Sequence, residues 1–108
     1  MDALATVIEN YVDTLPDCTQ KNAYGFICYF VKDRVFGLYD GSNVVLKFDK
    51  PTGDQLLAMR MGKRFRHATN AFGRSWILVN PEKVQSDEVL ETLIKQSYDY
   101  VLNSEAAA

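Results

Sequence analysis

The stretch from residue 22 to residue 49 constrains the fold more than any other part of the chain. It holds three runs rich in β-branched and aromatic residues, separated by two short polar breaks, Lys32-Asp33-Arg34 and Asp40-Gly41-Ser42-Asn43. Apolar runs between such breaks are typical of strands joined by hairpins. The sequence therefore predicts a three-stranded antiparallel meander.

The first and third runs of this meander differ in pattern. Residues 24–31 are apolar at nearly every position, so both faces of that strand should be covered. In the third run Val44, Leu46 and Phe48 alternate with polar Lys47 and Asp49. This alternation predicts one face in the core and one face in water.

Helices are expected before and after the meander. Apolar residues recur at helical spacing over 2–15, a stretch that Pro16 ends, and again over about 87–103, where Ser86 can cap the helix. Between these two helices we expect a short helix that opens with a Thr52-Gln55 capping box and stops at Gly62. We also expect a strand over 75–79, which could join the meander. The polar run 19–22 is read as a connection, and Gly25 and Gly37 are placed inside strands, at a bulge or a close contact.

This order of elements predicts the α+β class, an antiparallel meander sheet with the N- and C-terminal helices packed on one face. The length suits a single domain over 1–103, and the end of the chain, 104–108, should fray. The two cysteines, Cys18 and Cys28, have no partner at metal-ligand spacing, so we expect free thiols in a reducing compartment. No apolar run is long enough to cross a bilayer, and a cytoplasmic location is expected.

Basic residues are concentrated in one segment. The formal net charge is −2, yet residues 60–74 contain five of the 12 basic residues and none of the 14 acidic ones. This segment could hold a phosphate or carboxylate, or contact a nucleic-acid backbone; the plainer interpretation is a solvated loop whose arginines pair with acids elsewhere. The candidate binding residues are Lys21, Lys47, Lys63, Arg64, Arg66, His67 and Arg74.

No residue is assigned a catalytic or metal-binding role. His67 is the only histidine, no spacing resembles a metal-ligand set, and the sequence does not place either cysteine beside His67. The aromatic residues of the meander are interpreted as core rather than as a stacking platform for bases, and Trp76 as a core anchor. We therefore expect neither cofactor nor metal.

Several motifs carry a resemblance to a known family. The run Gln20 to Phe26, the hairpin Phe30 to Gly37 and the sequence Val45-Leu46-Lys47 resemble the N-terminal domain of TfoX/Sxy-type proteins. The later motifs Gly62-Lys63-Arg64-Phe65 and Gly73 to Val79, followed by Pro81 and a helix, look like the rest of that domain. The order of elements is also similar to the YjbR/MmcQ domains, whose closing helix carries a Ser-Tyr pair like Ser97-Tyr98.

The resemblance implies a bacterial protein connected with regulation rather than catalysis. Full-length TfoX-type proteins regulate natural competence and carry a second domain similar to helix-hairpin-helix modules; this chain ends where that domain would begin. Our leading hypothesis is a stand-alone, non-enzymatic binding or regulatory domain that contacts protein or nucleic acid through its basic segment. The alternative is a small anionic-ligand binder or enzyme with a pocket near His67 and Arg74, and a homodimer through the free sheet edge is a third hypothesis.

Overall fold

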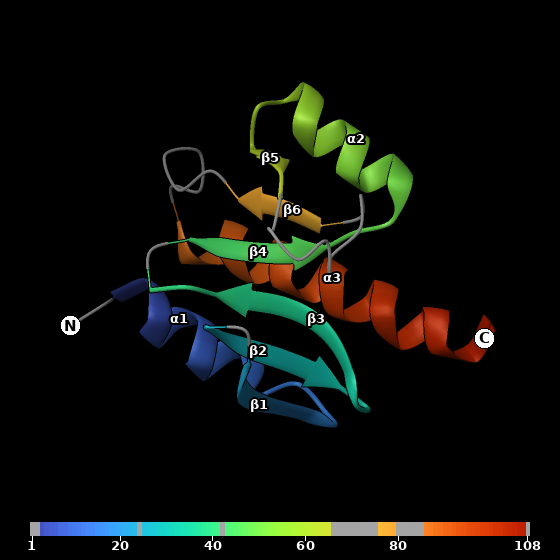
Figure 1. The fold of residues 1–108 in the computed structure, drawn as a ribbon. Helices are drawn as coiled ribbons and strands as arrows, with labels where there is room; N and C mark the ends of the chain where they lie inside the picture. Colours follow the sequence, from blue (N-terminus) through green and yellow to red (C-terminus); the bar gives the residue numbers. More distant parts are fainter. Residues whose placement is uncertain (1–2, 24, 42, 66–75, 80–85, 108) are drawn as a thin grey trace.

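The computed structural model describes residues 3–23, 25–41, 43–65, 76–79 and 86–107 (Figure 1). Within these residues the elements are α1 (Ala3–Val12), β1 (Cys18–Ala23), β2 (Phe26–Val31), β3 (Arg34–Tyr39), β4 (Val44–Lys47), α2 (Lys50–Ala58), β5 (Gly62–Arg64), β6 (Trp76–Val79) and α3 (Asp87–Ala107). The strands form one sheet in the order β1-β2-β3-β4-β6-β5, and every pairing is antiparallel. The predicted α+β class and the meander β2-β3-β4 are confirmed, and β6 does extend the meander.

The terminal helices pack on one face of the sheet, as predicted. In Figure 1 both α1 and α3 lie behind the strands, and α2 lies beside β5 and β6. The larger core fills the space between the helices and the sheet, because the helical apolar stripes meet the strand residues that point toward them. Its fully buried members include Ile8 of α1, Ile94 of α3, and Tyr29, Val31, Phe36, Leu46, Phe48 and Ile77 from the sheet side.

A second, smaller core covers the opposite face of the sheet. Cys28, Leu38, Val45 and Trp76 are buried there. The rings of Phe26 and Phe65 meet at 6.0 Å although β3, β4 and β6 lie between β2 and β5. Adjacent strands are about 4.8 Å apart, so the sheet must curl toward this face.

This second core tests the sequence predictions for each strand. Cys28 and Tyr29 are each 2% exposed, so both faces of β2 are covered as expected, and Trp76 is the predicted core anchor. The prediction that the third strand of the meander has a wet face was wrong, because Val45 is 1% exposed and Lys47 is half-buried. The curl of the sheet, which one strand's pattern does not encode, brings this face into contact with other residues.

Both edge strands were missed from the sequence. The polar run that was interpreted as a connection is β1, which pairs with β2 from Cys18↔Val31 to Ala23↔Phe26. Its side chains from residue 19 to 22 are all exposed, because the ladder to β2 holds it and no apolar alternation is needed. Gly25 does not lie inside a strand: it has φ +80° and lies between β1 and β2, where such a backbone favours glycine.

The other missed strand, β5, is too short to show a period. Its first residue, Gly62, runs close to β6: a Cβ there would lie 2.5 Å from Ile77 Cγ2 and 2.8 Å from the Leu78 carbonyl oxygen. Gly62 is therefore needed for close packing rather than to stop α2, which already ends at Ala58. The predicted role of this glycine was wrong because the sequence did not show a strand beside it.

The start of α2 also differs from its prediction. Asp49, not Thr52, caps the helix, and its Oδ1 accepts a hydrogen bond of 3.1 Å from the Thr52 amide. Pro51 lies in the first turn, where its fixed φ suits a helix, so the helix begins before the proline.

At α3 the predicted cap is confirmed, since Ser86 Oγ accepts a hydrogen bond from the Val89 amide at 3.3 Å. α3 runs to Ala107 instead of about 103; the fraying of 104–108 stays a prediction.

A bulge in β3 is where α3 is joined to the sheet. The β2–β3 register shifts between Tyr29 and Phe30, which leaves Phe36 without a partner in β2. The fully buried hydroxyl of Ser97 donates to the Phe36 carbonyl at 2.8 Å and accepts from the Lys47 amide at 3.1 Å. The β3–β4 ladder ends one pair earlier, at Gly37↔Leu46, so the serine hydroxyl substitutes for the next rung. The bulge thus lies beside Gly37, close to where the sequence suggested one.

Replacing Ser97 by alanine should lower the free energy of unfolding by about 2 to 4 kcal/mol, because two buried backbone groups lose their partner. Urea denaturation measures this. The control is Ser104→Ala on the same helix, whose hydroxyl donates only to the Tyr100 carbonyl of its own helix; it should change stability by less than about 0.5 kcal/mol. Equal effects of the two substitutions would contradict the role given to Ser97.

Two glycine substitutions should act in opposite directions. Gly62→Ala should destabilise the domain by about 1 to 3 kcal/mol, because the added methyl group collides with β6. Gly53→Ala in α2 should stabilise it by about 0.5 to 1 kcal/mol, since alanine suits a helix better; the new Cβ would lie at an ordinary 3.8 Å from Ile77. Thermal unfolding of the two variants checks both signs, and a loss of stability in Gly53→Ala would show that α2 is packed differently.

Candidate functional site

The structure describes four of the seven candidate binding residues and does not group them all. Lys21 lies on β1, and Lys63 and Arg64 lie on β5, at the opposite edge of the sheet. The Lys21 ammonium stands 5.7 Å from the centre of the Phe30 ring, and Lys47 lies on β4 between the two edges. The other three, Arg66, His67 and Arg74, lie outside the described residues, and so does the pocket predicted near His67 and Arg74.

The described basic residues of the 60–74 segment lie at one edge of the sheet. Lys63 pairs with Leu78 and Arg64 with Ile77. Since consecutive strand residues point to opposite faces, Arg64 points to the helix side, where Ile77 is buried, and Lys63 points to the other face. Arg60 lies in the turn after α2, and all three are exposed. We call Arg60, Lys63 and Arg64 the basic edge.

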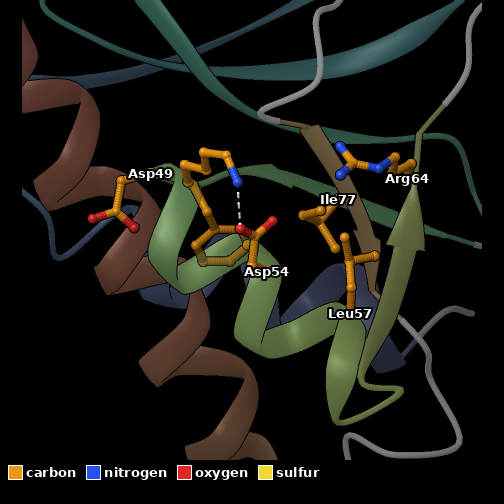
Figure 2. Close-up of a pocket in the computed structure, with 8 residues that line it drawn as sticks. Asp49, Asp54, Leu57, Arg64 and Ile77 are labelled. Carbon is orange, nitrogen blue, oxygen red and sulfur yellow. Dashed lines mark hydrogen bonds and ion pairs between the residues drawn. The ribbon is translucent and has the colours of Figure 1, made fainter.

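A hollow lies on the helix side of this edge, between α2 and the strands β5 and β6. Its volume is about 240 Å³, and we call it the α2 hollow. Figure 2 shows Arg64 reaching over Ile77 from β5, opposite an ion pair on α2 in which Lys50 Nζ lies 2.6 Å from Asp54 Oδ2. The hollow is lined by Phe48, Asp49, Lys50, Gly53, Asp54, Leu57, Arg64 and Ile77.

The lining of the α2 hollow contains two basic residues, Lys50 and Arg64, and two acidic ones, Asp49 and Asp54. The pKa of Asp54 is lowered, first by its hydrogen bond from Lys50 and then by the charges of Lys50 and Arg64. Asp54 therefore stays ionised at neutral pH and faces two cations. Asp49 caps α2, and its Oδ1 accepts a hydrogen bond from the Thr52 amide. The floor is apolar, which suits a ligand with one anionic group on a short hydrocarbon stem.

A second hollow lies on the other side of α2, against α3. It has a volume of about 630 Å³ and is lined by Phe48, Asp49, Thr52, Gln96, Asp99, Tyr100, Asn103 and Ser104. None of these residues is basic, and two are acidic. An anionic ligand would therefore be repelled here, and the basic edge and α2 hollow are the better candidate site for an anion.

The two cysteines and Tyr29 have raised pKa values. Cys18 and Cys28 are free thiols, as expected. Burial and the neighbouring Asp17 charge raise the pKa of Cys18 to about 11, and burial raises that of Cys28. Burial also raises the pKa of Tyr29, whose hydroxyl has no hydrogen-bond partner. All three groups stay protonated at neutral pH, whereas a nucleophile needs the deprotonated form.

The described residues hold neither a cluster of metal-ligating side chains nor a helix that could span a membrane. No group of three or more histidine, cysteine, aspartate or glutamate residues lies close enough there to hold a metal ion. In the same part of the chain, each helix is too short or too polar to span a bilayer.

Sequence reasoning missed the α2 side of the site. Lys50, Gly53 and Asp54 line the hollow but were not candidates. The available signal was the four-residue spacing of Lys50 and Asp54, which places opposite charges side by side on a helix. A glycine inside a short helix was a second signal, because it costs helix stability unless close packing or an open space explains it.

A comparison with models of known protein families identifies the family of this chain. The model of the TfoX N-terminal domain matches residues 10–101, a range that begins in α1, ends in α3 and includes the basic edge and the α2 hollow. A search of curated proteins found no match. Since the matched range covers most of the 108 residues, this chain belongs to the TfoX N-terminal domain family.

Proposed function

We propose that this domain is a non-enzymatic binding module that receives an acidic, extended segment of a protein partner along its basic edge. The proposal includes the regulatory role that the family resemblance implies and a cytoplasmic location, which the two free thiols favour. The raised pKa values of both thiols disfavour a thiolate nucleophile, which agrees with a non-enzymatic role.

The observation that carries the proposal is the position of β5. In the described part of the chain, β5 is the last strand of the sheet and pairs with β6 on one side only. An open strand edge can accept another strand through main-chain hydrogen bonds, and the alternating side chains then set specificity. Here those side chains are Lys63 on one face and Arg64 on the other, so two consecutive acidic residues of the partner, one pointing to each face, would complement both.

Charge also favours an acidic protein segment over the other partners considered. A nucleic acid would gain only the few phosphate contacts that this edge offers, while the net charge of −2 opposes a polyanion. A second copy of this chain paired through β5 would set Lys63 and Arg64 against the same basic residues, which destabilises a strand pair. The net charge opposes a short acidic strand less, because such a segment carries few charges, and only a strand can add main-chain hydrogen bonds to β5.

The small-ligand alternative keeps one supporting observation. Arg64, a predicted binding residue, lines the α2 hollow. The hollow is about 240 Å³, whereas pockets that enclose whole small molecules measure about 300 to 1,000 Å³. It is better matched to a single carboxylate group than to a complete metabolite.

Backbone amide shifts should locate the partner surface. We expect an oligo-glutamate peptide, added to the ¹⁵N-labelled domain, to shift the amides of residues 60–64, and an oligo-glutamine peptide of the same length to shift none. Charge reversal of Arg60 and Lys63 to glutamate should weaken peptide binding at least about tenfold, because both attractions become repulsions. Lys21→Glu on β1 is the matched control, an exposed lysine at the other edge, and should weaken binding far less.

Three results would overturn the proposal. The first is that the acidic peptide shifts no backbone amides, and the second is that the shifts are confined to β1. The third is that duplex DNA binds more tightly than the peptide through the same basic residues. The last result would identify a nucleic-acid-binding module.

A further inference from the structure

We infer that the α2 hollow is an anchor pocket for one carboxylate of the partner segment, and that Asp54 fills this position in the free domain as an internal competitor. This inference rests on the proposed function. It adds a specific subsite and a residue that lowers the affinity.

Asp54 already shows how a carboxylate is held here. Its Oδ2 lies 2.6 Å from Lys50 Nζ on the preceding turn of α2, and Figure 2 places Arg64 across the hollow from this pair. Both cations lower the pKa of Asp54, so both favour its charged form. The chain's own carboxylate therefore occupies a position flanked by two cations on different elements.

The ion pair between Lys50 and Asp54 can be broken at little cost in free energy. The side chain of Lys50 is 85% exposed and that of Asp54 is 48% exposed, and ion pairs so open to water are weak. Arg64 need not give up its existing contacts, because a guanidinium carries five N–H donors and can hold a carboxylate through two of them. An incoming carboxylate can thus replace Asp54 beside Lys50 and gain Arg64.

The hollow has the shape for a short acidic side chain. Phe48, Leu57 and Ile77 contribute apolar surface for methylene groups, and Gly53 leaves open the space that a side chain on α2 would fill. A strand paired with β5 would point alternate side chains to the helix side, next to Arg64. One acidic residue of that strand therefore reaches the mouth of the hollow.

Two substitutions test the pocket without touching the basic edge. Asp54→Asn keeps the shape of the side chain but removes the competing charge, so the oligo-glutamate peptide should bind about three- to tenfold more tightly. Gly53→Ala places a methyl group in the hollow, and we expect binding at least about tenfold weaker. Because this alanine should also stabilise α2, unfolding cannot explain the loss.

The control for general charge is Asp99→Asn. Asp99 forms the equivalent pair with Lys95 on α3, at 2.7 Å, and its side chain is 44% exposed against 48% for Asp54, but it does not line the α2 hollow. Its effect on peptide binding should be small. Fluorescence anisotropy with the same peptide measures all variants.

The outcomes separate this inference from the proposed function. The anchor-pocket inference is wrong if Asp54→Asn and Asp99→Asn change the affinity for the peptide equally and Gly53→Ala leaves that affinity unchanged. Should the Arg60 and Lys63 reversals still abolish binding in that case, the basic edge remains the binding surface. A domain that does not bind the peptide at all overturns both.

Discussion

The hydroxyl group of Ser97 is the contact on which the arrangement of this domain depends. It joins α3 to β3 and β4 where the bulge at Phe36 interrupts the sheet, and it supplies partners to two buried backbone groups. The next residue, Tyr98, donates to the Pro16 carbonyl at 2.8 Å and so ties the same turn of α3 to the segment after α1. The Ser-Tyr pair therefore has a structural role: it sets where the long helix lies.

The position of the candidate site follows from this contact. Ser97 holds the Lys47 amide at the end of β4, and two residues later Asp49 caps α2. The direction in which α2 leaves the sheet, and with it the space between α2 and β5, is thus set from the buried core. The residues that give the site its charge, Lys50, Asp54, Lys63 and Arg64, are exposed. They can change with little loss of stability, so one scaffold can carry different binding surfaces.

Charge separates the two sides of α2. On the β5 side Arg64 meets the Lys50–Asp54 pair, and on the α3 side the lining residues are acidic or neutral. A domain with a net negative charge can therefore still attract an anionic segment, provided that the segment approaches along the basic edge. Such local attraction is screened by salt, which is the expected behaviour of a transient contact.

The family was suggested by the resemblance of its motifs. Local patterns in the sequence were sufficient to predict the central strands, β6, the terminal helices and the α+β class. Each of these depends on contacts between near neighbours or on an apolar period that burial enforces. The edge strands β1 and β5 could not be recognised, because their order comes from ladders to β2 and β6 rather than from their own side chains. The sequence named Lys63 and Arg64 as binding residues, but only the tertiary structure brought Arg64 next to Lys50, Gly53 and Asp54 across the α2 hollow. A pocket built from separate segments exists only after the sheet has curled and α2 has packed against it, and no spacing along the chain records that distance.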